Sequence, residues 1–187
     1  MSADVRPQRR FTAESFVAWA GGREGRYELF NGKVVAQASE LVAHARTKFA
    51  VSLALHEAIK NAGAPCHFLP DGVAVKIGSA TVYEPDALVY CGPELPGSAL
   101  LVEKPILVVE VLSPSTGSSD KSRKLIGYFG LPSVIHYLIV DPEEPHVIHH
   151  QRVAGGEIRT RILNGGVIRL DPPGLEIAFR QIYPSLA

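Results

Sequence analysis

Ile106-Leu-Val-Val-Glu-Val-Leu112 is the stretch that decides the fold, because six apolar residues surround a single acid, Glu110. An apolar run of this length is typical of a strand that is buried on both faces of a sheet. A second run of the same character spans 134–140 and ends at Asp141-Pro142. These two runs, with a helical segment between them, predict a mixed α/β or α+β sheet protein.

Glu110 is the first candidate functional residue, because its carboxylate lies in the middle of a strand that should be buried. An unpaired buried carboxylate costs several kcal/mol or stays protonated. The side chain therefore needs a cation, a basic partner or a water-lined cleft.

The rest of the chain alternates between helical and strand patterns. Asn31-Gly32, the favoured dipeptide of a type I′ turn, predicts a β-hairpin over 26–36. Helices are expected over 13–20, 41–62 and about 118–130. Further strands are expected over 66–69, 73–77 and 86–91, with antiparallel edge strands over 146–152, 157–163 and 167–170.

The expected helix over 41–62 has an apolar stripe at helical spacing, and Gly63 and Pro65 end it. The stripe consists of Val42, Ala45, Phe49 and Leu53. His44 and Lys48 are four residues apart, so they share a neighbouring face of the same helix.

Length and composition indicate one domain over 1–187, with an N-terminal extension and short helix over 1–25 and the core over 26–187. The longest apolar run is far short of the ~20 residues of a membrane helix, and residues 1–11 are polar, so a cytoplasmic protein without a membrane segment is expected. Cys66 and Cys91 form no CxxC pair, which favours two reduced thiols over a single bridge.

Charge is balanced overall, with 19 Lys plus Arg and 19 Asp plus Glu, so no global field indicates a nucleic-acid binder. The acids are clustered, however, because residues 61–120 contain two basic residues against seven acids. An acidic centre of this kind either repels phosphate or holds cations.

Asp86 follows Pro85 and opens the expected strand over 86–91. If that strand lies beside the Glu110 strand, the two carboxylates can reach one Mg²⁺, a hard ion that prefers carboxylate and water oxygens. Together the two acids predict a metal site that neither could form alone.

Five motifs in this order resemble the Uma family of restriction-endonuclease-like proteins, from Tyr27 to the C-terminal strands. They are Tyr27-Glu-Leu-Phe-Asn-Gly, Pro85-Asp-Ala-Leu-Val, Val108-Val-Glu-Val-Leu-Ser-Pro-Ser-Thr, the spacing Asp120-xxx-Lys124-xxx-Tyr128, and Tyr137-Leu-Ile-Val-Asp-Pro. The family is assigned to the PD-(D/E)XK nuclease superfamily. The resemblance implies a central mixed β-sheet flanked by helices, here with an additional antiparallel C-terminal portion, and Mg²⁺-dependent phosphodiester hydrolysis.

The resemblance also implies roles for individual residues. Asp86 and Glu110 match the two acidic metal ligands, and Val111 would add its backbone carbonyl. The superfamily's lysine should stand two residues after Glu110, but Leu112 stands there. The family resemblance places that catalytic role on Lys124 instead, where a lysine would orient the attacking water or stabilise developing negative charge.

Four further side chains complete the expected site. Glu28 matches an acid that supports the metal or the attacking water, and it is expected to be catalytic. His44 matches a histidine of the family's first long helix and is expected to contact phosphate or substrate. The same contact is expected for Lys48, Lys121 and Tyr128.

The function expected from these residues is endonucleolytic hydrolysis of DNA with Mg²⁺ or Mn²⁺ as cofactor, by a homodimer if both strands of a duplex are cut. The alternative is a catalytically degenerate nuclease fold that binds nucleic acid or a protein partner, which Leu112 favours. Other enzyme classes lack their motifs: there is no GxSxG elbow and no Walker loop. His146, His149 and His150 do not make a zinc site, because strand alternation separates the last two.

Overall fold

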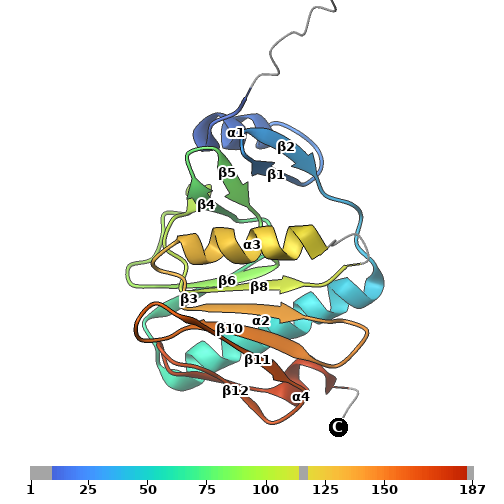
Figure 1. Cartoon of the computed structure of the whole chain (residues 1–187), viewed down its shortest axis with the longest axis vertical. Helices are drawn as coiled ribbons and strands as arrows, with labels where there is room; N and C mark the ends of the chain where they lie inside the picture. Colours follow the sequence, from blue (N-terminus) through green and yellow to red (C-terminus); the bar gives the residue numbers. More distant parts are fainter. Residues whose placement is uncertain (1–9, 114–117, 185–187) are drawn as a thin grey trace, which may run out of the picture.

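The run that contains Glu110 forms β8 (Leu107–Val111), an inner strand of a six-stranded sheet in the order β11-β10-β9-β8-β6-β3. The computed structural model describes residues 10–113 and 118–184 (Figure 1). β8 pairs in parallel with β9 and antiparallel with β6, so the sheet is mixed, as predicted. The other strands of this sheet are β3 (Cys66–Pro70), β6 (Ala87–Cys91), β9 (His136–Val140), β10 (Val147–Arg152) and β11 (Ile158–Leu163).

Two helices cover opposite faces of this sheet (Figure 1). The alternation of side chains along β6 and β8 explains both contacts. Val109 packs in the core cluster that contains Val51 and Leu55 of α2 (Val42–Ala62). Val108, the neighbouring residue, packs in the cluster that contains Tyr128 of α3 (Ser118–Gly130). The fold class expected from the sequence is therefore confirmed.

The buried face of α2 differs from the apolar stripe that the sequence displays. Val42, Phe49 and Leu53 of the stripe are 68%, 71% and 47% exposed. Inside the protein the helix instead places His44 and Lys48 in its first half, with small and aliphatic residues further along. The helix was predicted correctly, but the stripe is not its packed face.

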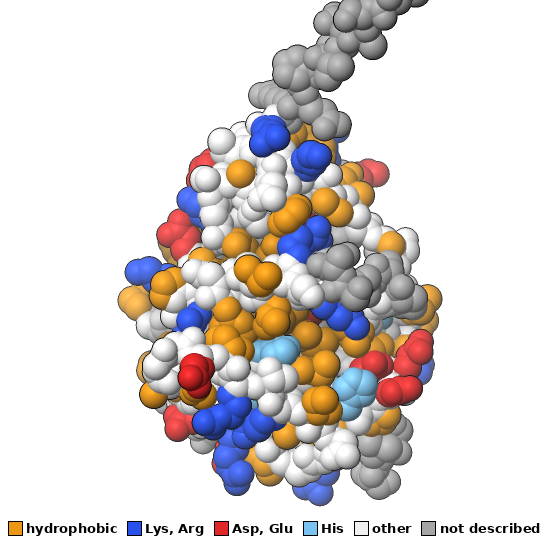
Figure 2. All heavy atoms as spheres, viewed as in Figure 1, with side chains coloured by type: hydrophobic (Ala, Val, Ile, Leu, Met, Phe, Trp, Pro, Cys, Tyr) orange, Lys and Arg blue, Asp and Glu red, His pale blue; other side chains and the backbone are white. Residues whose placement is uncertain are grey.

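α3 covers only part of its face of the six-stranded sheet. Figure 2 shows hydrophobic side chains that remain visible on this side of the molecule. Ile126 on the outer side of α3 is 75% exposed, and Ile162 on β11 is 72% exposed. Ile162 is the register partner of Ile148 on β10, which packs against the same cluster as α3. The β11 edge of this face is therefore left open to solvent.

A smaller sheet has the order β2-β1-β5-β4-β7 and packs against α1 (Ala13–Ala20). Asn31 and Gly32 both have positive φ, 48° and 78°, as the predicted type I′ hairpin requires. Thr12 and Ser15 form a capping box at the start of α1. The strands are β1 (Tyr27–Phe30), β2 (Lys33–Ala36), β4 (Ala74–Gly78), β5 (Thr81–Tyr83) and β7 (Leu101–Val102).

The C-terminal portion forms its own antiparallel hairpin of β12 (Val167–Leu170) and β13 (Leu175–Ala178), followed by α4 (Phe179–Ile182). It packs in the cluster on the α2 side of the large sheet. Among residues 10–113 and 118–184, every helix is too short or too polar to span a bilayer.

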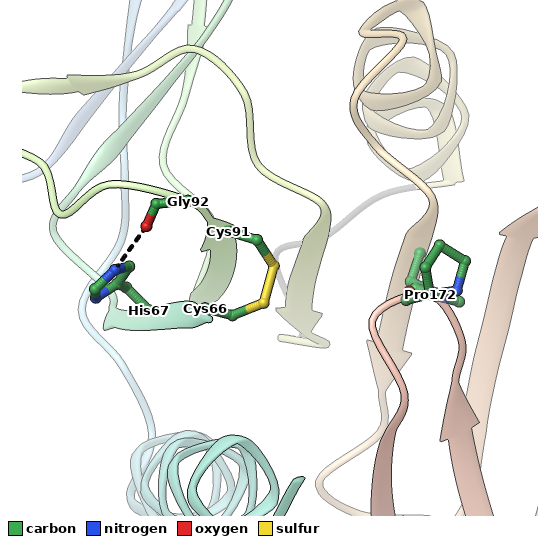
Figure 3. The surroundings of a disulfide bond; sticks show 6 residues. Cys66, His67, Cys91, Gly92 and Pro172 are labelled. Atoms are coloured by element: carbon green, nitrogen blue, oxygen red, sulfur yellow. Dashed lines mark hydrogen bonds between the residues drawn. A yellow bond between two sulfur atoms is a disulfide. The ribbon is translucent and has the colours of Figure 1, made fainter. Parts of the chain in front are cut away.

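Cys66 and Cys91 form a disulfide, so the expectation of two reduced thiols is wrong (Figure 3). The two residues are register partners on the neighbouring strands β3 and β6, which places their side chains on the same face. Spacing along the sequence does not reveal such a cross-strand pair, because it depends on the register of the two strands. The bond links the edge strand β3 to the strand that Asp86 precedes.

Candidate active site

Asp86 lies immediately before β6 and Glu110 lies on the neighbouring strand β8, so the two acids stand at adjacent positions, as predicted. Ala87 is the register partner of Val109, and each acid comes one residue beyond that pair. The backbone N–H of Asp86 donates to the Val109 carbonyl at 3.0 Å. Its carboxylate Oδ2 accepts the backbone N–H of Val111 at 2.7 Å. Asp86 therefore closes the end of the β6–β8 ladder and is fixed close to Glu110.

Lys124 of α3 reaches Glu110, as predicted, and its ammonium Nζ lies 2.9 Å from both carboxylate oxygens. The same Nζ lies 3.0 Å from Oε1 of Glu28 on β1. One helical turn after Lys124, the Tyr128 hydroxyl donates to Glu110 Oε1 at 2.6 Å. Glu28 is held in turn by the backbone N–H of Glu84 at 2.9 Å. These contacts join elements of both sheets and α3.

The Glu110 carboxyl has its pKa raised to about 7. Burial is the main cause, and the charges of Asp86 and Glu28 add to it, whereas Lys124 and the Tyr128 hydroxyl oppose it. The pKa of Lys124 is also raised, because Glu110 and Glu28 together outweigh the effect of burial. Lys124 therefore stays protonated at neutral pH, while Glu110 is poised between its two forms.

Lys48 of α2 is the centre of a second group of acids. Its ammonium lies 2.6 Å from Glu40 Oε1 and 3.3 Å from Asp86 Oδ1, and it also contacts Asp71. Burial lowers the pKa of Lys48, but the hydrogen bonds to Asp71 and Glu40 raise it by more than burial lowers it. The net shift of the pKa is therefore upward. Lys48 is thus paired with carboxylates, and the phosphate or substrate contact expected for it stays a prediction.

Arg26 binds the outer side of this second group. Its guanidinium lies 2.9 Å from Glu84 and 3.1 Å from Asp71, and it also contacts Glu40. Sequence reasoning missed Arg26, Glu40, Asp71 and Glu84. All four lie in connections between elements, where no periodicity signals that distant residues will meet.

His44 lies between the Lys48 group and β8. Its Nε2 is 3.0 Å from the Val111 carbonyl and 3.8 Å from Asp86 Oδ2, and its Nδ1 is 3.5 Å from Glu40 Oε2. Because a carbonyl only accepts, Nε2 carries the proton in that hydrogen bond. Glu40, His44 and Asp86 each offer one ligand atom within 4.8 Å of the others, a spacing at which one metal ion could be held.

The remaining expected contacts, Tyr128 and Lys121, behave differently from each other. Tyr128 is fully buried and donates its hydroxyl to Glu110, and the substrate contact expected for it stays a prediction. Lys121 is partly exposed and lines a cavity of about 240 Å³ next to His44. Lys124, Lys48 and His44 are placed in the candidate site, and Lys121 is placed beside it.

Negative charge is in excess at this site, because six carboxylates face three cations. The acids are Glu28, Glu40, Asp71, Glu84, Asp86 and Glu110, and the cations are Arg26, Lys48 and Lys124. A partly buried set of acids in excess over its internal cations favours binding of a further cation.

Known proteins resemble this chain over most of its length. An uncharacterized protein of Synechocystis is 26% identical over 183 residues, which is 97% of this chain and 95% of that protein. A crystal structure described as "a putative nuclease belonging to DUF820", from Anabaena variabilis, superposes with a TM-score of 0.74 over 95% of this chain and 99% of its own. At 14% identity this second likeness shows a shared fold. The Uma2 family model, described as "Putative restriction endonuclease", matches residues 13–182, and the chain therefore belongs to the Uma2 family.

Proposed function

We propose that this protein is an endonuclease that hydrolyses phosphodiester bonds in DNA with Mg²⁺ or Mn²⁺. The observation that carries the proposal is the contact of Lys124 with Glu110, beside Asp86, in a buried site with excess negative charge. A lysine and two acids at the end of neighbouring strands are the elements that the nuclease resemblance requires. In this chain the lysine comes from α3, because Leu112 occupies its usual position.

The donor set fits a hard divalent cation. Asp86, Glu110 and the Val111 carbonyl are the proposed ligands, and Glu40 and His44 lie close enough to complete the set. When bound, such an ion lowers the pKa of water and offsets the charge of the phosphate. Lys124 already contacts both oxygens of Glu110, so a bound metal ion would compete with the ammonium for this carboxylate.

Lys124 supplies the fixed positive charge of the proposed reaction. Its raised pKa keeps it protonated, and its contacts to Glu110 and Glu28 hold the ammonium in one place. A preorganised buried cation stabilises negative charge that develops on a phosphate far better than a solvated one. Glu28 is the positioning residue for this lysine, and Tyr128 is the positioning residue for Glu110.

A second candidate function is binding of nucleic acid without cleavage. The observation that favours it is that lysines of the protein itself already pair with the acids. Lys48 contacts Glu40 and Asp86, and Lys124 contacts Glu28 and Glu110. A site that is closed by its own lysines binds a metal more weakly than one with free acids. The two functions differ in whether a metal displaces these contacts.

The test is cleavage by purified protein of plasmid, linear, single-stranded and branched DNA and of RNA, with Mg²⁺, Mn²⁺, Ca²⁺ or EDTA. We expect cleavage with Mg²⁺ and Mn²⁺ but not with Ca²⁺ or EDTA. Glu110→Gln removes a ligand charge with little change of shape and should abolish it. Glu94→Gln, an exposed acid outside the site, is the matched control.

Two outcomes would reject the proposal. Cleavage that survives EDTA or Glu110→Gln would come from a contaminant or from another mechanism. Binding of nucleic acid with no cleavage of any substrate would support the second candidate instead. Sedimentation of the protein with and without duplex DNA tests the homodimer that we propose for cutting both strands.

A further inference from the structure

A cavity of about 240 Å³ opens beside the candidate active site, between α2, α3 and the ends of two parallel strands. Leu112 follows β8 and Asp141 follows β9, so the cavity lies at the carboxyl ends of strands that pair in parallel. Ligands of open α/β sheets bind in this position. The lining residues are Leu41, Ala43, His44, Leu112, Ser113, Lys121, Asp141, Pro142 and Glu143.

The N-terminus of α2 faces this cavity without a side-chain cap. Leu41 occupies the N-cap position and has no side-chain oxygen to accept a hydrogen bond, and the first turn contains no acid. The first hydrogen bond of the helix runs from the Ala45 N–H to the Leu41 carbonyl at 3.0 Å. The preceding N–H groups of the first turn have no partner within the helix, and they are the positive end of a 21-residue dipole. Such an end binds anions, phosphate in particular.

His44 gives independent evidence for a ligand. The side chain is 7% exposed, and its Nδ1 lies 3.5 Å from Glu40 Oε2 but makes no hydrogen bond to the residues that the structure describes. A buried polar atom in this state costs free energy unless a ligand or a water satisfies it. His44 also lines the cavity and touches the site through Val111, so a ligand here would lie next to the reacting phosphate.

The size and the walls of the cavity restrict the ligand. The volume is below the roughly 300–1,000 Å³ of pockets for drug-sized molecules, so it suits one nucleotide and not a base pair. Leu41, Leu112 and Pro142 provide apolar surface for a base, and Lys121 provides a cation for a phosphate. The Asp141 carboxylate accepts the N–H groups of Glu143 and Glu144 at 2.9 and 3.0 Å, which compensates part of its charge.

We infer that this cavity takes one unpaired nucleotide of the substrate strand, with its phosphate toward the N-terminus of α2 and Lys121. The inference rests on the proposed nuclease function and narrows its substrate class. A paired base cannot enter a cavity of this size, so it must leave the helix first, at a cost of a few kcal/mol. The substrates are therefore single strands, flaps and frayed ends rather than the interior of an intact duplex.

Binding is measured in EDTA, so that no cleavage occurs, by fluorescence anisotropy of one labelled DNA strand. The strand is offered alone, in a blunt duplex and in a duplex with an unpaired flap. We expect wild type to bind the single strand and the flap about tenfold or more tighter than the blunt duplex. This ratio corresponds to the free energy of unpairing and unstacking one nucleotide.

Two variants place the preference in the cavity. Ala43→Trp fills it from an exposed helical position, where the risk to folding is small. Lys121→Ala removes its cation. Each should weaken binding of the single strand by about tenfold, the value of one charge-assisted contact. Lys104→Ala removes an exposed lysine elsewhere and should have no effect. Thermal melting establishes whether each variant is folded. If Ala43→Trp is unfolded, the result for Lys121→Ala alone decides the test.

Equal affinity for the blunt duplex, no binding of any DNA, or equal effects of Lys121→Ala and Lys104→Ala would overturn the inference. The nuclease proposal fails separately, on the cleavage assay. Strand-selective binding without cleavage rejects only the nuclease. Metal-dependent cleavage without strand preference rejects only the nucleotide cavity.

Discussion

Replacing Glu110 by Gln should stabilise the protein more at neutral pH than at acidic pH. The carboxyl of Glu110 has an ordinary pKa of 4.5, and burial raises it to about 7 in the folded protein. Between these two values the folded state keeps a proton that the unfolded chain has released. Stability of the wild type therefore falls as pH rises through this window, and Gln has no proton to lose.

The size of the effect follows from the two pKa values. One pKa unit corresponds to roughly 1.4 kcal/mol, so the whole shift amounts to about 3 kcal/mol. Between pH 5 and pH 7 we expect the variant to gain about 2 kcal/mol of unfolding free energy relative to wild type. Gln also removes one of the two carboxylates that hold Lys124. That loss shifts the difference by a constant, because Lys124 stays protonated throughout this range.

The assay is urea unfolding of wild type and Glu110→Gln at pH 5, 6, 7 and 8 in EDTA, with the disulfide kept oxidised. Glu94→Gln is the control, since an exposed acid should leave the pH dependence unchanged. A difference between Glu110→Gln and wild type that stays constant from pH 5 to pH 8 would refute the reasoning. It would mean that the pairing with Lys124 outweighs burial and keeps the pKa of Glu110 near its ordinary value.

Three further changes test other parts of the structure. Lys124→Ala should slow cleavage on the order of a hundredfold while calorimetry still detects Mn²⁺ binding; loss of both together would contradict separate roles. Reducing the Cys66–Cys91 bond should lower the unfolding free energy by about 3 kcal/mol, measured in urea with and without dithiothreitol, and a Cys66→Ser variant should not respond to the reductant. Gly127→Ala should cost about 1–3 kcal/mol, because the new Cβ would lie 2.6 Å from the Tyr83 ring. Gly130→Ala, with nothing within 4 Å, is its control in thermal melting, and equal effects would argue against the clash.

Long, uniform signals in the sequence predicted the elements that form the large sheet and its helices. The apolar run of β8 and the Asn31-Gly32 turn are local features, and local features are readable from residue types alone. β5 and β7 were not predicted, because three and two residues are too few to show a period. Their strand conformation comes from the partners that they meet.

The face of α2 shows why the site itself was harder to predict. Apolar periodicity indicates the face with Phe49 and Leu53, but the buried face of this helix carries His44 and Lys48, which contact Glu40 and Asp86. Phe49 is left in solvent as a consequence. Asp86, Glu110 and Lys124 were found because an acid in an apolar strand is conspicuous and a family motif includes the lysine. Glu40 and Asp71 carry no such signal, since their positions depend on tertiary contacts.

The chain crosses from the small sheet to the large one at the place where the charges meet. β5 ends at Tyr83 and β6 begins at Ala87, so only three residues connect the two sheets there. Glu28 belongs to the small sheet and Glu110 to the large one, and Lys124 contacts both. The crossing from β3 to β4 also has three residues, and the crossing from β7 to β8 has four, so several short connections restrict how far the two sheets can tilt. A tilt of one sheet against the other would separate Glu28 from Glu110, so these short connections help to keep both acids on Lys124.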